Sequence, residues 1–247
     1  MIPPSLLTVS TLRIEYRLVD RGGPLVVFSN GAGRGYEDWD AVVGLLGDGC
    51  STLRWNRPGV GQSDPPDRPQ TCAVSAGLLA GLLETVADRT AGRRLVMVGH
   101  SLGGSIVEKL LESPGSGIAA CVLVEPTTAE GVEYVLGHGM YDAQGTLGEA
   151  DHARESMGEL RGTGPVEPVP IVIIAGTKEL DQSDYLYGYR SFRLGELERY
   201  ALRFGDARVV RAPASLHFPQ LTEPALVADE IRRMTGMPSP AAAPPGG

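Results

Sequence analysis

Short runs of branched apolar residues recur along the chain and dominate its hydrophobic pattern. These runs occupy residues 25–29, 51–55, 94–99, 120–125, 171–176 and 207–212. Most of them lack the alternation of polar and apolar residues that marks a half-exposed strand. Such runs are typical of strands that are covered on both faces of a parallel sheet. We therefore predict six buried strands.

The stretches between these runs have the length and composition of helices. The predicted helices occupy residues 38–47, 71–90, 103–112, 184–204 and 223–235. Alternation of strand and helix predicts an α/β protein with a doubly wound, mostly parallel sheet. The first segment, "LLTVSTLRIEYRLVD", alternates more strongly and is followed by "RGG". This pattern predicts an antiparallel hairpin at the edge of the sheet.

One long interval, residues 126–170, breaks this rhythm between two predicted strands. It is much longer than an ordinary connection between a strand and a helix, and it includes helical patterns near 128–137 and 148–161. We interpret it as a small helical lid inserted into a single domain of residues 1–235. The Pro-, Ala- and Gly-rich end, residues 236–247, is predicted to be a disordered tail.

The sequence Gly99-His100-Ser101-Leu102-Gly103 follows a predicted buried strand and precedes a predicted helix. This is the context of a nucleophile elbow, in which a serine lies on a tight turn between strand and helix. The glycines are needed there because larger side chains clash in so strained a turn. The helix that follows favours negative charge at its first turn. Ser101 is therefore the candidate nucleophile.

Two other turns at strand ends supply partners for Ser101. The turn that begins at Asn30 offers exposed backbone N–H groups, and we expect that of Ala32 to form an oxyanion hole with that of Leu102. His217 follows the last predicted strand. Open α/β sheets build their sites at the C-terminal ends of strands, where Ser101 and His217 are both expected to lie.

Over nearly its whole length the chain resembles the α/β-hydrolase fold superfamily. The resemblance is carried by "NRPGVGQSD", "GHSLGG", "VLVEP" and "LHFPQLTEPALVADEIRRM". It implies a Ser101 nucleophile, a His217 base and a lid over the site. The chain departs from the pattern at Asn30, where many relatives have a histidine, so substrate contacts at this position are expected to differ.

The acid that orients His217 has three candidates. Relatives usually carry it three residues beyond the strand that ends at Gly176, and that position holds Glu179. Asp181 lies two residues further on. A minority of relatives, such as haloalkane dehalogenases, carry a glutamate after the strand that follows the elbow helix, where this chain has Glu125 in "VLVEP". We favour Glu125, then Glu179, then Asp181; the alternative for Glu125 is a loop acid that caps the turn.

Composition limits the partners and the chemistry. The 247 residues carry a net charge of −8 without a cluster of Lys and Arg, which argues against a nucleic-acid partner. The sequence contains no apolar run long enough for a membrane span and no signal-peptide pattern, so we expect a cytoplasmic protein. Cys50, Cys72 and Cys121 lack the spacing of thiolate ligands, and neither a metal nor a cofactor is expected.

These observations favour a serine hydrolase that cleaves a carboxylic ester, lactone or thioester of a small molecule through an acyl-enzyme. Two alternatives use the same fold: a lyase, cyclase or cofactor-free oxygenase, or a ligand-binding receptor with a vestigial triad. Asn30, Tyr134 and Met140 are the candidate substrate-binding residues. The sequence gives no indication of an oligomeric state.

Overall fold

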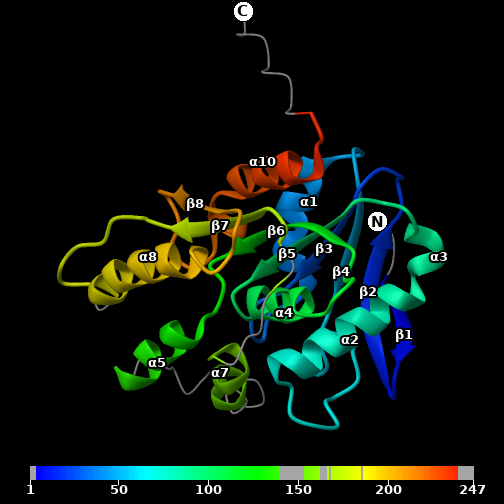
Figure 1. The fold of residues 1–247 in the computed structure, drawn as a ribbon, viewed down its shortest axis with the longest axis horizontal. Coiled ribbons are helices and arrows are strands. Elements are labelled where there is room, and N and C mark those ends of the chain that lie inside the picture. The colour runs from blue at the N-terminus through cyan, green and yellow to red at the C-terminus, as the bar shows by residue number, and fades with distance from the viewer. Residues whose placement is uncertain (1–3, 139–152, 162–165, 167, 185, 239–247) are drawn as a thin grey trace, which may run out of the picture.

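The computed structural model describes residues 4–138, 153–161, 166, 168–184 and 186–238. This part of the chain forms an eight-stranded sheet in the order β1-β2-β4-β3-β5-β6-β7-β8 (Figure 1). The strands are β1 (Ser5–Val9), β2 (Leu12–Val19), β3 (Leu25–Ser29), β4 (Ser51–Trp55), β5 (Leu95–His100), β6 (Ile118–Val124), β7 (Ile171–Gly176) and β8 (Ala207–Ala212).

The sheet is parallel from β4 to β8, whereas β1 and β2 run antiparallel at one edge. The predicted fold class and the predicted edge hairpin are thus confirmed. β5 is the strand that leads into the turn at Ser101, and β6 pairs with it, as expected from the chain order. The C-terminal ends of β5 and β6 therefore lie side by side.

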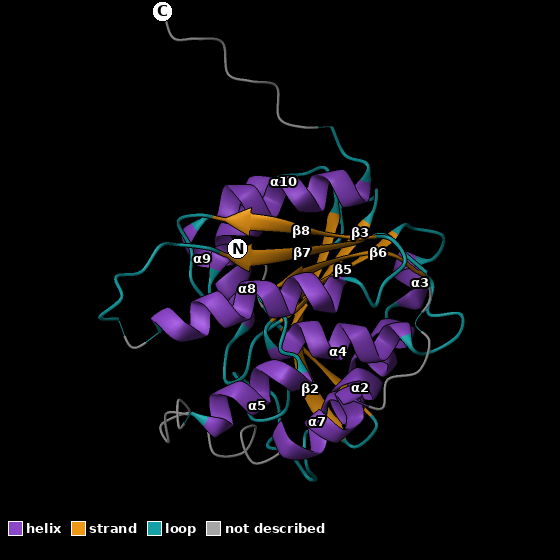
Figure 2. Cartoon of the chain, turned by 60° about the vertical axis from the view of Figure 1, so that its left-hand side comes forward, coloured by secondary structure: helices purple, strands orange, loops and turns teal. Residues whose placement is uncertain are grey.

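Helices cover both faces of the sheet. They are η1 (Tyr36–Trp39), α1 (Asp40–Leu46), α2 (Cys72–Thr85), α3 (Ala87–Thr90), α4 (Leu102–Leu111), α5 (Ala129–Gly137), α7 (Ala153–Arg161), α8 (Tyr187–Ala201), α9 (Pro219–Thr222) and α10 (Pro224–Thr235). Figure 2 shows α10 on one side of the sheet and α4 and α8 on the other. Val26 and Phe28 of β3 pack in one core cluster, and Val27 packs in the other. Because successive side chains of a strand point to opposite faces of the sheet, one buried strand contributes residues to the core on each face.

The helix boundaries differ from the predicted ones where the backbone must turn. The predicted helix 71–90 is interrupted at Val86, which ends α2 before the short α3 begins. The last predicted helix is preceded by α9, because Pro219 and Pro224 each start a new helical turn. These are corrections of a few residues and leave the order of elements unchanged.

Helices α5 and α7 come from the interval for which a lid is predicted. α5 packs against α7 and α8, and α7 packs against α2. Ser156 and Glu159 of α7 accept hydrogen bonds from the backbone N–H groups of Cys72 and Ala73 at the start of α2 (3.1 and 2.9 Å). Residues 139–152, 162–165 and 167 lie outside the described residues, as does the end of the predicted tail, so the lid stays a prediction.

Candidate active site

Ser101 lies at the sharp junction between β5 and α4. Its backbone has φ 51° and ψ −120°, a strained conformation for a residue with a side chain. A Cβ atom on Gly99 would lie 2.5 Å from the Gly103 carbonyl oxygen, and one on Gly103 would lie 2.2 Å from that of Ser29. The two glycines are therefore a steric requirement of the turn, as the sequence pattern indicates.

The Ser101 hydroxyl has two side-chain partners. Its Oγ lies 3.1 Å from Nε2 of His217, which follows β8, and 3.2 Å from Oγ1 of Thr127, which follows β6. Thr127 is held in place because its backbone N–H donates to the Ser101 carbonyl and its own carbonyl accepts from Ser105 Oγ. The sequence analysis did not find Thr127, although its place two residues beyond Glu125 is a usable signal.

Glu125 lies on the far side of the His217 ring. Its Oε2 is 3.6 Å from His217 Nδ1, and the side chain is fully buried. The Gly176 N–H donates to Oε1 (2.7 Å), and Arg193 Nε donates to Oε2 (3.2 Å). Burial opposes ionisation, but His217, Arg193 and the Gly176 N–H outweigh it and hold the Glu125 pKa at about 2. Glu125 is thus an anion at neutral pH.

The other two candidate acids lie elsewhere. Glu179 and Asp181 are exposed in the loop after β7. Asp181 accepts hydrogen bonds from the backbone N–H and the hydroxyl of Ser183 (2.9 and 2.7 Å), which close a local turn and lower the pKa of this carboxyl. Of the three carboxylates, the structure therefore brings only Glu125 to the ring of His217.

The predicted oxyanion donors belong to segments beside Ser101. A Cβ atom on Gly31 would lie 3.5 Å from Ser101 Cβ, so the backbone that leads into Ala32 passes close to the nucleophile. Buried Arg57 fixes this backbone by donating to the carbonyl oxygens of Asn30 and Gly31, both at 2.6 Å. The Leu102 N–H is the first of α4 and has no acceptor within the helix.

The side chain of Asn30, a predicted substrate contact, is bonded within the fold. Its side chain is buried, its Nδ2 donates to the Trp55 carbonyl (3.0 Å), and its Oδ1 accepts from Trp39 Nε1 (2.9 Å). These bonds join the loop after β3 to β4 and η1. The amide is held by these structural contacts, and Asn30 is not among the residues that line the cavity beside Ser101.

A cavity of about 180 Å³ opens beside Ser101 and His217. Its lining residues are Ser101, Thr127, Thr128, Gly131, Val132, Val135, Tyr189, Arg193 and His217. Tyr134 is not among them, because it stacks on His138 and Phe192 with ring centroids 4.0 and 4.3 Å apart. Met140, the other predicted substrate contact on this segment, lies outside the described residues.

Known proteins resemble this chain both in sequence and in fold. The sequence model of the alpha/beta hydrolase family matches residues 26–163, more than half of the chain. The chain belongs to the alpha/beta hydrolase family. A curated relative, the dihydrolipoyllysine-residue acetyltransferase component of the acetoin cleaving system of Cupriavidus necator, is 29% identical over 118 residues. The match covers 48% of this chain and 30% of the relative, so the chain spans about a third of that protein's length.

Solved structures of other proteins share the fold. A hydrolase from Pseudomonas aeruginosa is 21% identical with a TM-score of 0.68, and the match covers 94% of this chain and 98% of that one. An esterase from Thermogutta terrifontis is 15% identical with a TM-score of 0.69 (94% and 97% covered). An enol-lactonase from Burkholderia xenovorans is 19% identical with a TM-score of 0.68 (94% and 100% covered). At these identities the likeness concerns the fold alone.

The three cysteines lie apart from this site. Cys50, Cys72 and Cys121 are free and buried, and burial raises the pKa of the Cys72 thiol to about 11. Among the described residues, no His, Cys, Asp and Glu side chains group as metal ligands would. No helix in the same part of the chain is long and apolar enough to cross a membrane.

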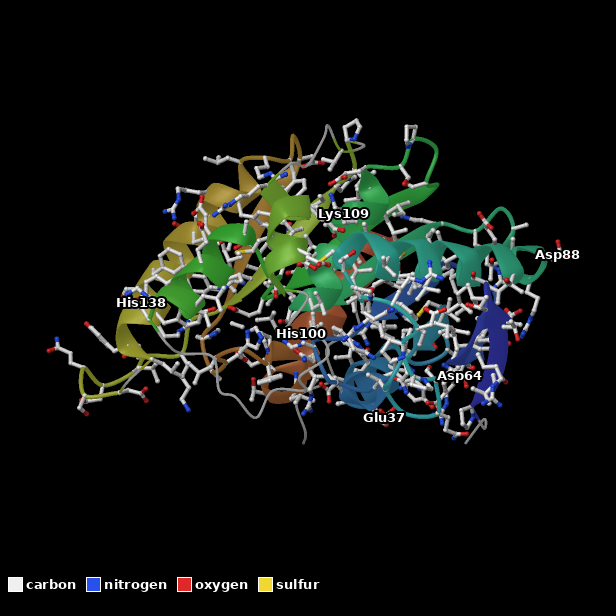
Figure 3. The ribbon with its side chains drawn as sticks, turned by 90° about the horizontal axis from the view of Figure 1, so that it is seen from below. Glu37, Asp64, Asp88, His100, Lys109 and His138 are labelled. Atoms are coloured by element: carbon white, nitrogen blue, oxygen red, sulfur yellow. The ribbon has the colours of Figure 1, made fainter. Side chains whose placement is uncertain are left out.

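His100 supports the His217 loop from within the protein. It lies in the interior in Figure 3, whereas His138 lies toward the periphery. His100 Nε2 is 2.7 Å from the His217 carbonyl oxygen and must donate to it, so Nδ1 carries no proton in the neutral ring. Burial is the main cause that lowers its pKa to about 3. His100 is therefore a neutral donor that fixes the backbone of His217.

This buried histidine predicts a pH-dependent stability. Because the ordinary pKa is about 6.5, the unfolded chain binds more protons than the folded one between pH 6.5 and 3, and stability falls as the pH drops through this window. At pH 5 the loss from His100 is about 2 kcal/mol relative to pH 7. His100→Gln keeps an N–H donor that does not titrate. Urea unfolding at both pH values is expected to show a smaller pH difference in His100→Gln than in the unmodified protein; equal differences would contradict this role.

Proposed function

We propose that this protein is a serine hydrolase that cleaves a carboxylic ester, lactone or thioester through an acyl-enzyme on Ser101. The observation that carries the proposal is the line of contacts from Ser101 Oγ through the His217 ring to the buried Glu125 carboxylate. A hydroxyl, an imidazole and an anion in this order are what nucleophilic acyl transfer requires.

The proposed reaction has two halves. His217 Nε2 takes the Ser101 proton while Oγ attacks the carbonyl carbon, and the backbone N–H groups of Ala32 and Leu102 hold the oxyanion. His217 then gives the proton to the leaving oxygen or sulfur, and the acyl-enzyme remains. In the second half, His217 removes a proton from water, which attacks the acyl carbon. His217 then returns that proton to Ser101 Oγ as the acyl bond breaks, and the carboxylic acid is released.

Glu125 acts through His217 in this scheme. As an anion it favours the tautomer with the proton on Nδ1 and stabilises the imidazolium that forms when Ser101 is deprotonated. The 3.6 Å separation is longer than a hydrogen bond. The proposal requires this contact to shorten once the ring is charged, and catalytic contacts commonly tighten in this way when substrate binds.

The cavity beside Ser101 supports a short acyl group. Its volume of 180 Å³ equals that of about six water molecules in the liquid, at about 30 Å³ each. Val132 and Val135 of α5 form an apolar part of its wall. Acyl groups of two to four carbons fit this space, while longer chains would have to displace α5 or leave the cavity.

A series of p-nitrophenyl esters tests the proposal. We expect kcat/KM to be highest for the acetate and butyrate and to fall by at least about tenfold for the octanoate, because each extra methylene that finds no space loses its burial energy. Val135→Ala should narrow this gap, whereas Val74→Ala on α2, away from the cavity, serves as the matched control. Rates that climb steadily with chain length would rule out the short-acyl assignment, and no turnover of any ester would rule out the hydrolase.

A further inference from the structure

Four charged side chains form a cluster behind the Ser101–His217 pair: the buried Glu125, Arg193 and Glu196, and the partly buried Arg190. Arg193 and Glu196 lie on α8, and both side chains are 2% exposed. Arg193 Nε binds the same Glu125 oxygen, Oε2, that faces the His217 ring. The other two nitrogens of the guanidinium donate to Glu196 Oε2 and to the Pro126 carbonyl.

This arrangement places charges of alternating sign in a row. A single carboxylate next to His217 favours a proton on the ring, and a cation bound to that carboxylate opposes it. Glu196 contacts Arg193 and so offsets part of the opposing charge. Glu125, Arg193 and Glu196 are buried, so solvent and salt screen the interactions among these three charges weakly. The His217 side chain at the end of the row is 40% exposed, so the effect of Arg193 and Glu196 on its ring is partly screened.

We propose that Arg193 and Glu196 are positioning residues that set the pH range in which His217 acts as a base, and that they act with opposite signs. Arg193 makes proton uptake by the His217–Glu125 pair less favourable and extends activity toward low pH. Glu196 makes the same uptake more favourable and limits that extension. The inference rests on the proposed function, since it assigns the base role to His217.

The other charged groups around the pair do not take over this role. Arg190 lies farther from Glu125 than Arg193 does, with Nη1 4.0 Å from Oε1. Tyr189, also on α8, has a pKa raised by burial and stays neutral. From β5, His100 is neutral, as argued above. Arg34, on the loop after β3, lies over the Phe218 ring and is paired with Asp38.

The same two residues are tied to the wall of the cavity. Glu196 accepts a hydrogen bond from Thr128 Oγ1, and this hydroxyl in turn accepts from the Gly131 N–H at the start of α5. A loss of activity alone would therefore not separate an electrostatic role from a structural one. The direction of a pH shift separates them, because a structural defect does not move the profile in opposite directions for the two residues.

The experiment is the pH profile of kcat/KM for p-nitrophenyl butyrate, with the released acid detected directly at each pH. For Arg193→Met we expect the midpoint of the acid limb to rise by about 1 to 2 pH units, since a buried cation near the pair is removed. For Glu196→Gln we expect the midpoint to fall by about 0.5 unit, because the arginine charge is then less compensated. Arg193→Lys keeps the charge and should retain the midpoint of the unmodified protein, although kcat should fall because lysine cannot form the three contacts of the guanidinium.

Arg199→Met on the exposed side of α8 is the matched control, since Arg199 pairs with Glu130 at the surface and should leave the midpoint unchanged. Midpoints that do not move, or that move the same way in Arg193→Met and Glu196→Gln, would overturn the inference. If Arg193→Met does not fold, a fall in Glu196→Gln supports the inference, and no fall or a rise overturns it.

A second readout separates this inference from the proposed function. Histidine labelled with ¹³C gives four ring signals, and that of His217 is identified by its loss in His217→Asn. The pH midpoint of this signal should rise in Arg193→Met and fall in Glu196→Gln even if no ester is hydrolysed. If both variants shift the midpoint of the His217 signal but no ester is hydrolysed, only the proposed hydrolase function is contradicted. If esters are hydrolysed but the midpoint does not shift, only the role of Arg193 and Glu196 is contradicted.

Discussion

Ser101→Ala is expected to lower kcat for ester hydrolysis by about 10⁴- to 10⁶-fold while the protein stays folded. The alanine lacks the oxygen that forms the acyl bond, and the Thr127 hydroxyl beside it has no comparable contact with the base. Alanine and serine strain the φ 51° turn to the same degree, so the unfolding temperature should change little. Steady-state kinetics and thermal unfolding measure the two effects.

Ser113→Ala, at the exposed end of the segment that follows α4, is the matched control and should turn over esters normally. The residual rate of Ser101→Ala should equal the background given by oxyanion stabilisation and binding alone. Turnover by Ser101→Ala within tenfold of the unmodified protein would mean that the acyl group is carried by another residue or that water attacks directly.

The second large effect is expected at the acid. Glu125→Gln should lower kcat by up to about 10⁴-fold, because a neutral amide no longer favours the Nδ1–H tautomer of His217. The variant also leaves the Arg193 charge compensated by Glu196 alone, which disfavours the imidazolium further. Glutamine keeps the shape of glutamate and an oxygen that accepts from the Gly176 N–H, so the fold should be retained.

Glu179→Gln and Asp181→Asn are the controls for this assignment. Both side chains are exposed, so their kcat values should stay within about threefold of the unmodified protein. Replacing Asp181 should lower the stability only slightly, since its exposed carboxylate closes a local turn at Ser183. A loss of activity in Glu179→Gln that matches the loss expected of Glu125→Gln would reassign the acid to the loop after β7.

The elements of this fold could be predicted from the sequence because each follows from a local pattern. Uninterrupted apolar runs predict the central strands, and the alternating first segment predicts the edge hairpin. The turn at Ser101 could also be predicted, since Gly99 and Gly103 exclude a Cβ for reasons that lie within a few residues of the serine.

The rest depends on contacts between distant residues. The order of the strands and the contact with Arg193 decide that Glu125 is the carboxylate that reaches His217. Arg193 lies 68 residues beyond Glu125, and its burial could not be predicted from the sequence. Asn30 is a predicted substrate contact, but only the structure shows that bonds to Trp55 and Trp39 hold its amide within the fold. Thr127 contacts Ser101 only because β6 pairs with β5.

Labelling of the folded protein with a fluorophosphonate, followed by mapping of the modified residue by mass spectrometry, tests the central claim most directly. The reagent phosphonylates a serine only where a base and an oxyanion site activate it, and it needs no knowledge of the natural substrate. The account predicts one adduct, on Ser101, that is absent from Ser101→Ala and forms much more slowly in Glu125→Gln. A folded protein that takes up no label, or that is labelled equally well in Ser101→Ala, would contradict it.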